Sequence, residues 1–215
     1  MEKKRIVCFG DSLTWGFDPD THLRMADYGR WTSVMRKLLG DGYEVIEEGQ
    51  CGRTIATDDP AEGEKSGIRY IVPCLESHNP LDLVIIMLGT NDCKRKFSYS
   101  ARDIAGEMQR LIEKVLAFNR FKCGDSFKIL LVAPPKISKA VVPSWLGDMF
   151  GFDNSVKVSA DLADWYKQVA EMYGCLFMDA SEYAVVSDSD GIHMDAANQA
   201  KLGEAMAEFV KALKL

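Results

Sequence analysis

The sequence predicts an α/β domain in which helices cover both faces of a five-stranded parallel sheet. Residues 83–88 and 129–133 are continuously apolar, which is typical of strands that are buried on both faces. Apolar runs also alternate along the whole chain with stretches of helical periodicity, the pattern of successive β-α-β units. The length suits one domain with a sizeable core, which we assign to residues 1–215.

The first half of the chain supplies three of the five strands. An apolar run at residues 5–9 ends at Gly10, and residues 44–48 and 83–88 follow as the second and third strands. Helices are expected between them, at residues 31–39 and 66–77.

The second half continues the alternation with strands at residues 129–133 and 176–179. A helix precedes the first of these, because apolar residues recur there at helical spacing: Ile104, Met108, Leu111, Ile112 and Val115. Residues 155–172 form a further helix, and Asp195 is placed to cap the last one. The whole series predicts a three-layer α/β/α sandwich with right-handed crossovers.

Two long connections, residues 17–30 and 136–154, do not fit this alternation. Long connections commonly form lids or contact surfaces. The second is rich in apolar residues: Val141, Val142, Trp145, Leu146, Met149, Phe150 and Phe152. We expect it to cover a site or to form a contact in a homo-oligomer, and its composition favours the contact. The alternative is that it packs into the core of its own chain.

Composition limits the partners and the compartment. The net charge of −6 argues against a nucleic-acid or anionic-membrane partner. The apolar run at residues 83–88 is far too short for a membrane span, and the run at residues 6–9 is too short for a signal peptide. The six cysteines form no C-x-x-C pair and are expected to be free thiols. The expected location is the cytoplasm.

Polar residues follow four of the predicted strands. Ser12 comes after the first strand, Gly52 after the second, Asn91 after the third, and Asp190 with His193 after the fifth. Ligands of open α/β sheets bind at the carboxyl ends of the strands, so these residues are expected to meet at one edge.

Three of these residues can form a nucleophile, a base and an orienting group. A serine hydroxyl needs a base within hydrogen-bond reach, and only His193 among the three histidines follows a strand. Asp190, three residues earlier, can bind Nδ1 of His193 and leave Nε2 to face Ser12. Asp188 is a competitor for this role.

Attack by a serine on an ester creates an oxyanion, which needs preorganised donors. The Ser12 N–H group, the Gly52 N–H group and the Asn91 side-chain amide are the candidates. Trp15, Ile192 and Trp145 are candidates for the substrate pocket, and we expect these loops to be braced by three charged residues: Asp11, Arg53 and Asp92. Each motif taken alone is ordinary turn chemistry, and only their joint placement favours catalysis.

These motifs resemble those of the SGNH, or GDSL, hydrolase family, whose four blocks contribute a serine, a glycine, an asparagine and a histidine. The corresponding segments are GDSLTWG with Ser12, GQCGRT with Gly52, GTND with Asn91, and DGIH with Asp190 and His193. The sequence looks most like the bacterial arylesterase/acyltransferase branch. The resemblance implies a flavodoxin-like fold, hydrolysis through an acyl-serine without metal or cofactor, short acyl groups and frequent oligomerisation.

The sequence thus predicts a serine esterase of short-chain carboxylic esters, with transfer to an alcohol as a further activity. The alternatives for the substrate are an acetylated carbohydrate, a lysophospholipid and a thioester. A phosphoester hydrolase is disfavoured because the sequence has neither a P-loop nor clustered carboxylates. A binding module without catalysis should lack one of the central residues, yet all are present: Ser12, Asn91, Asp190 and His193.

Overall fold

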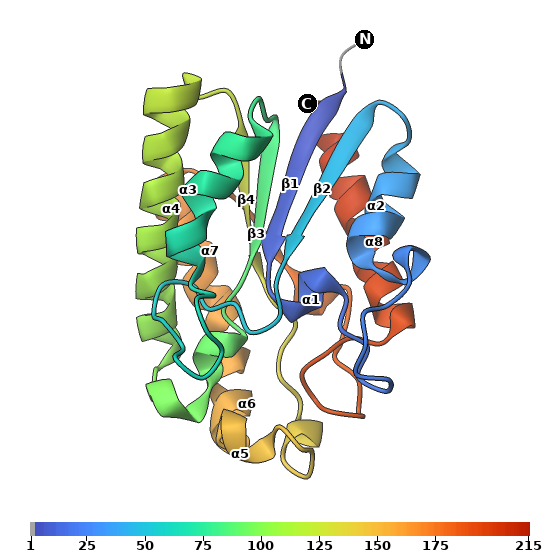
Figure 1. Ribbon diagram of the computed structural model, residues 1–215, viewed down its shortest axis with the longest axis vertical. Helices are drawn as coiled ribbons and strands as arrows, with labels where there is room; N and C mark the ends of the chain where they lie inside the picture. Colours follow the sequence, from blue (N-terminus) through green and yellow to red (C-terminus); the bar gives the residue numbers. More distant parts are fainter. Residues whose placement is uncertain (1–2) are drawn as a thin grey trace.

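The computed structural model describes residues 3–215, which form a five-stranded parallel sheet between two layers of helices (Figure 1). The strands are β1 (Lys4–Gly10), β2 (Tyr43–Gly49), β3 (Leu83–Met87), β4 (Lys128–Ala133) and β5 (Leu176–Asp179). Their order is β2-β1-β3-β4-β5, and all four pairings are parallel. This is the flavodoxin-like order, so the predicted fold class and all five strands are confirmed.

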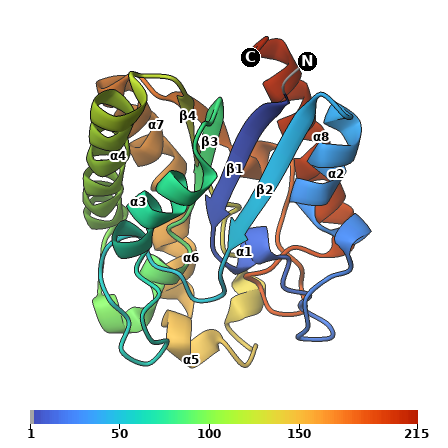
Figure 2. The ribbon, with the colours of Figure 1, turned by 45° about the horizontal axis from the view of Figure 1, so that its top comes forward.

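Helices cover both faces of the sheet. On one face lie α3 (Gly67–His78), α4 (Ala101–Cys123) and α7 (Leu162–Tyr173), and on the other lie α2 (Trp31–Leu39) and α8 (Ala196–Ala212) (Figures 1 and 2). Successive β1 side chains alternate between the two cores: Val7 and Phe9 pack on the first face, Ile6 and Cys8 on the second. Residues 6–9 of β1, all of β3 and residues 129–133 of β4 are therefore apolar on both faces, as the sequence pattern indicated.

Two features of the helices bear on the sequence predictions. Asp195 caps α8 as predicted, because its carboxylate accepts a hydrogen bond from the Asn198 N–H group at 2.8 Å. The single helix predicted at residues 155–172 is wrong: α6 (Asp153–Ala160) ends at Ala160 and α7 begins at Leu162, with Asp161 between them. The Ser159 hydroxyl bonds the Val156 carbonyl and accepts the N–H of Ile137, local bonding that competes with helix continuation.

One buried side chain ties the last helix to the start of the chain. Gln199 of α8 accepts a hydrogen bond from the Trp31 N–H group at 2.9 Å and donates to the Leu13 carbonyl at 3.1 Å. It therefore joins α8 to α2 and to the short helix α1 (Ser12–Trp15). This bond network fixes the first and last parts of the chain against one another.

The connections at the carboxyl ends of the strands gather at the lower end of Figure 1. They include α1, α5 (Gly147–Phe150) and five short 3₁₀ helices among the described residues: Asp27–Gly29, Asn91–Cys93, Arg95–Phe97, Lys139–Val141 and Ala180–Glu182. Since β1 lies between β2 and β3, the order in which successive strands are added to the sheet reverses between β1 and β3, and ligands of such folds bind at this switch point.

The long connection 136–154 is divided between the core and the surface. Val141, Leu146 and Phe150 are buried in the core of their own chain, whereas three other side chains are partly in solvent: Trp145, Met149 and Phe152. The alternative that this connection packs into the core of its own chain therefore holds for three of its seven apolar residues. In the part of the chain that the structure describes, every helix is too short or too polar to cross a bilayer.

Candidate active site

Ser12 lies on a tight turn directly after β1. The Asp11 carboxylate accepts a hydrogen bond from the Leu13 N–H group at 2.9 Å and so caps α1. Gly10 permits this turn because a Cβ there would collide with the hydroxyl of Thr14. The turn leaves the Ser12 side chain 6% exposed, at the wall of a cavity.

His193 and Asp190 complete a hydrogen-bonded chain with Ser12. His193 Nε2 lies 2.9 Å from Ser12 Oγ, and His193 Nδ1 lies 2.6 Å from Asp190 Oδ2. The other Asp190 oxygen accepts the N–H groups of Ile192 at 2.9 Å and His193 at 2.8 Å. Burial would raise the pKa of Asp190, but the hydrogen bond and charge of His193 together with these two amides lower it below the usual range.

The turn that carries Asp190 packs tightly against the segment 136–154. Gly191 has φ +75°, and a Cβ there would collide with the backbone of Val141. Its carbonyl accepts the Ser138 N–H at 3.0 Å. Asp188, the competitor for the orienting role, is exposed, and it is Asp190 that bonds His193.

The three predicted oxyanion donors lie around the same cavity. Among the described residues, no acceptor is bonded to the N–H groups of Ser12 and Gly52, so both are available to a ligand. Gly52 has φ +81°, a conformation that favours glycine. The Asn91 amide donates to the Arg53 carbonyl at 3.1 Å and, over a long 3.4 Å, to Asp11. The weaker contact is the one that an oxyanion can replace.

The cavity has a volume of about 150 Å³ and two unlike walls. The polar wall is lined by Ser12, Cys51, Gly52, Glu62, Thr90, Asn91, Lys94 and His193. The apolar wall is lined by Phe17, Trp145, Leu146, Met149, Phe150 and Ile192. Two of the predicted pocket residues, Trp145 and Ile192, are thus at the cavity. Trp15 is not among its lining residues: the Arg24 guanidinium lies over its ring at 5.4 Å.

Aromatic rings that the sequence analysis did not predict at the site lie beside the His193 imidazole. The Phe17 ring centroid is 4.3 Å from that of His193. The His22 ring stacks on Phe17, and its centroid lies 5.4 Å from that of Trp145. These contacts come from the long connection 17–30, and no periodic pattern in the sequence could have revealed them.

The polar wall contains a buried ion-pair network that the sequence also did not reveal. Lys94 is 2% exposed in its side chain and places Nζ 2.9 Å from Glu62 and 3.2 Å from Asp59. Glu62 in turn bonds Lys65 at 3.1 Å. Because Glu62 and Lys94 line the cavity, they put one negative and one positive group within it.

The three charged residues expected to brace the loops do make such contacts. Arg53 donates to the carbonyls of Gly10, at 2.8 Å, and Glu48. Asp92 accepts the Ile55 N–H at 3.0 Å. Asp11 contacts both α1 and Asn91, and its burial raises its pKa to about 6.

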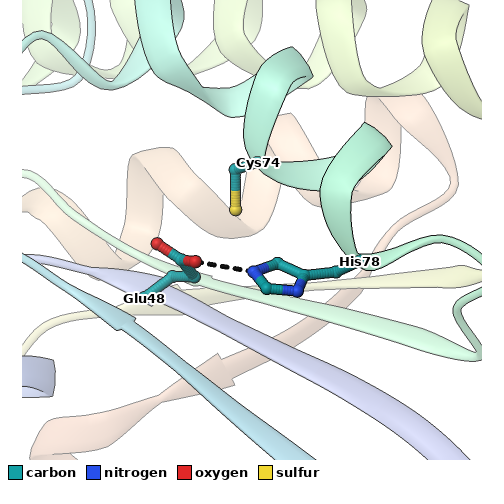
Figure 3. A group of neighbouring side chains, drawn as sticks. All are labelled: Glu48, Cys74 and His78. Atoms are coloured by element: carbon teal, nitrogen blue, oxygen red, sulfur yellow. Dashed lines mark hydrogen bonds and ion pairs between the residues drawn. The ribbon is translucent and has the colours of Figure 1, made fainter.

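A further polar cluster lies between α3 and β2 (Figure 3). Cys74 and His78 project from successive turns of α3 toward Glu48 of β2, and their ligand-type atoms lie within 4.8 Å of one another. His78 Nε2 is hydrogen-bonded to Glu48 Oε1 at 2.7 Å, and burial raises the pKa of the Cys74 thiol to about 12. These contacts account for the cluster as a neutral thiol beside a hydrogen-bonded pair that joins α3 to the end of β2.

The chain is similar to several esterases of known structure. It is 40% identical to the aryl esterase of M. smegmatis, with 98% of this chain and 99% of that chain aligned and a TM-score of 0.90. It is 39% identical to a carbohydrate acetylesterase from Sinorhizobium meliloti, with 98% and 100% coverage and a TM-score of 0.89.

A curated relative and a family model agree with the structural likeness. The chain is 27% identical over 220 residues to an acetylxylan esterase of Xylanibacter ruminicola; the match covers 96% of this chain but only 43% of that protein, so the chain spans less than half of its length. The model of the GDSL-like lipase/acylhydrolase family matches residues 8–201. With nearly the whole chain matched and its motif residues gathered at one cavity, the protein belongs to the GDSL-like lipase/acylhydrolase family of ester hydrolases.

Proposed function

We propose that this protein is a serine esterase that cleaves short-chain carboxylic esters through an acyl-serine. The observation that carries the proposal is the hydrogen-bonded chain Asp190–His193–Ser12 at the wall of a cavity that also receives two unbonded N–H groups. In this reading Ser12 is the nucleophile, His193 the general base and acid, and Asp190 the group that orients the imidazole.

The distances fit a two-stage reaction. As Ser12 Oγ attacks the ester carbonyl carbon, its proton passes to His193 Nε2, 2.9 Å away, and the carbonyl electron pair moves onto the oxygen. The N–H groups of Ser12 and Gly52 and the Asn91 amide donate to that oxyanion. Collapse breaks the bond to the alcohol oxygen, which takes the proton from His193. Water, or another alcohol, then attacks the acyl-serine by the same route in reverse.

The size of the cavity favours a small acyl group. About 150 Å³ holds an acetyl or similarly short chain, and the lining residues Leu146, Phe150 and Ile192 are themselves buried. We therefore favour acetyl esters over lysophospholipids or long thioesters. The S. meliloti and X. ruminicola relatives make an acetylated carbohydrate the preferred physiological substrate, and aryl acetates the practical one.

An ester panel tests this proposal. The rate should fall with acyl length in the series p-nitrophenyl acetate, butyrate and octanoate. The panel also includes three further acetyl donors: naphthyl acetate, acetylated xylo-oligosaccharides and acetyl-CoA. Ser12→Ala should lose about 10⁴-fold or more in kcat, whereas Ser77→Ala, on the exposed side of α3, should keep the wild-type rate. Full activity in Ser12→Ala would refute the acyl-serine mechanism.

We also propose that the protein acts as a homo-oligomer in the cytoplasm. Trp145 lines the cavity and is 58% exposed, and Phe152 on the same connection is 45% exposed. The six cysteines are free thiols, as in a reducing compartment. Light scattering on a sizing column should show an oligomer that Trp145→Ala/Phe152→Ala dissociates. Phe121→Ala, which removes an exposed ring on α4, is the control. A monomeric wild type at micromolar concentration would refute the subunit contact.

A further inference from the structure

The Asp92 carboxyl is buried without a complete set of donors. Its side chain is 0% exposed, and Oδ1 accepts the Ile55 N–H group at 3.0 Å. Among the described residues, no N–H or hydroxyl group donates to Oδ2. A buried carboxylate oxygen without a donor is costly, so the ionised form of this group has no adequate partner here.

The group beside Asp92 is a second carboxylate, that of Glu107 on α4. Asp92 holds the N–H group of Ile55 and Glu107 holds those of Ala56 and Thr57, so the two carboxyl groups lie against three successive residues of one loop. Glu107 raises the pKa of the Asp92 carboxyl, after burial itself. The oxygens of Glu107 already accept several donors: the N–H groups of Ala56, at 3.3 Å, and Thr57, at 3.2 Å, and the hydroxyls of Thr57 and Tyr99. This set of donors suits an ionised carboxylate, which only accepts.

Two buried carboxyl groups side by side avoid mutual repulsion if one of them carries a proton, which they can then share in a hydrogen bond. We propose that Asp92 is a neutral carboxylic acid that donates its Oδ2–H to the Glu107 carboxylate, and that this pair positions the oxyanion donors. Four further groups interact electrostatically with Asp92 and are acids as well, so they supply no compensating positive charge: Asp11, Cys93, Tyr99 and Tyr166. Burial raises the pKa of Asp92 far above its usual range, in agreement with this assignment.

The pair anchors the loop that carries Gly52. Asp92 holds the N–H of Ile55, and Glu107 holds those of the next two residues. The same loop offers the Arg53 carbonyl to the Asn91 amide at 3.1 Å. The spacing between the Gly52 N–H and the Asn91 amide therefore depends on the shared proton. Its loss would place two negative charges side by side in the interior and displace the loop.

The first test measures charge and does not use enzyme activity. Since Asp92 is neutral in this assignment, Asp92→Asn should leave the electrophoretic mobility of the folded protein at pH 8 unchanged. Asp188→Asn, an exposed substitution, should shift the mobility by one charge. A shift of one charge in Asp92→Asn would overturn the proposal.

Infrared spectroscopy tests the same assignment on the wild-type protein, without reliance on a variant. At pH 8 Asp11, whose pKa is about 6, is ionised, so the carbonyl stretch of a protonated carboxylic acid should come from Asp92. That band should be present in the wild type and absent from Asp92→Asn. Its absence from the wild type would overturn the proposal.

The kinetic test rests on the proposed esterase function. Asp92→Leu, which removes both the donor and the acceptor, should lower kcat for p-nitrophenyl acetate by roughly 10- to 100-fold with little change in KM. Asp92→Asn keeps an acceptor for Ile55 and a donor for Glu107, so it should restore kcat and extend activity to higher pH than the wild type. Equal losses in both variants would overturn the positioning role. If neither the wild type nor any variant cleaves an ester, the proposed esterase function is refuted, whereas the charge and infrared measurements still test the protonation of Asp92.

Discussion

The Asp190 carboxylate has two roles, one in orienting His193 and one in stabilising the turn, and different substitutions separate them. Oδ2 bonds the His193 imidazole at 2.6 Å, whereas Oδ1 holds the N–H groups of Ile192 and His193. Asp190→Asn keeps the hydrogen bonds to the two N–H groups, because an amide oxygen can replace Oδ1. It loses the correct orientation of His193, because an amide N–H that faces Nδ1 selects the tautomer with its proton on Nε2. That tautomer cannot take the Ser12 proton.

The expected sizes of the two effects follow from these contacts. Asp190→Asn should lower kcat by about 10⁴-fold, as the equivalent change does in other serine hydrolases, with little loss of stability. Asp190→Ala should lose the same activity and in addition leave two buried N–H groups without acceptors. Each such group costs about 1–3 kcal/mol, so the alanine variant should be about 2–6 kcal/mol less stable.

Stopped assays with p-nitrophenyl acetate at pH 7.5 give kcat, and urea unfolding followed by circular dichroism gives the free energy of unfolding. Asp188→Asn, two residues away and exposed, is the matched control and should behave as the wild type. The reasoning would be refuted if Asp190→Asn kept more than about a tenth of the wild-type kcat, because the activation free energy would then have risen by less than about 1.4 kcal/mol.

Three further predictions concern the same site. Asn91→Ala should lower kcat about 10²–10³-fold while KM stays nearly constant, because the amide serves the oxyanion rather than the substrate; a change confined to KM would assign it to substrate binding. Lys94→Met should reduce the free energy of unfolding in urea by up to about 3–5 kcal/mol, because Asp59 and Glu62 lose the buried cation that they share and each keeps only one more exposed lysine, whereas Lys96→Met, a more exposed partner of the same Asp59, should cost under about 1 kcal/mol. Since the pKa of Asp190 is lowered in the folded protein, its carboxylate stabilises the fold above the unfolded pKa of about 3.9, and this contribution is lost as the pH falls through the folded pKa. The difference in free energy of unfolding between wild type and Asp190→Ala, measured in urea, should therefore narrow below about pH 4. A difference that is independent of pH would contradict this expectation.

The sheet could be predicted because its strands carry their own signal. Residues 83–88 and 129–133 are apolar throughout, which only strands buried on both faces require, and β3 and β4 follow there. The break between α6 and α7 lies two residues after Ser159, whose hydroxyl accepts the N–H of Ile137, 22 residues away. Periodicity describes one helix face and carries no information about such a tertiary hydrogen bond, so the break could not be predicted.

The site divides in the same way. Ser12, Asn91 and the DGIH turn could be located because each follows a strand, and the carboxyl ends of parallel strands meet. Phe17 and His22 reach His193 and Trp145 along an irregular loop, whose path leaves no pattern in the sequence. The pairing of Lys94 with Glu62 joins residues 32 apart and likewise becomes visible only when the chain is folded.

The bond between Ser12 and His193 joins residues that are 181 positions apart, and buried Gln199 fastens the helix that follows His193 to α1 and α2. The segment from Ser12 to α8 must therefore be synthesised and closed into its final topology before the nucleophile has a base. Contacts between such distant residues incur a large loop-closure entropy and form late in folding. During biosynthesis the nascent chain thus carries an inert serine until α8 has left the ribosome and docked.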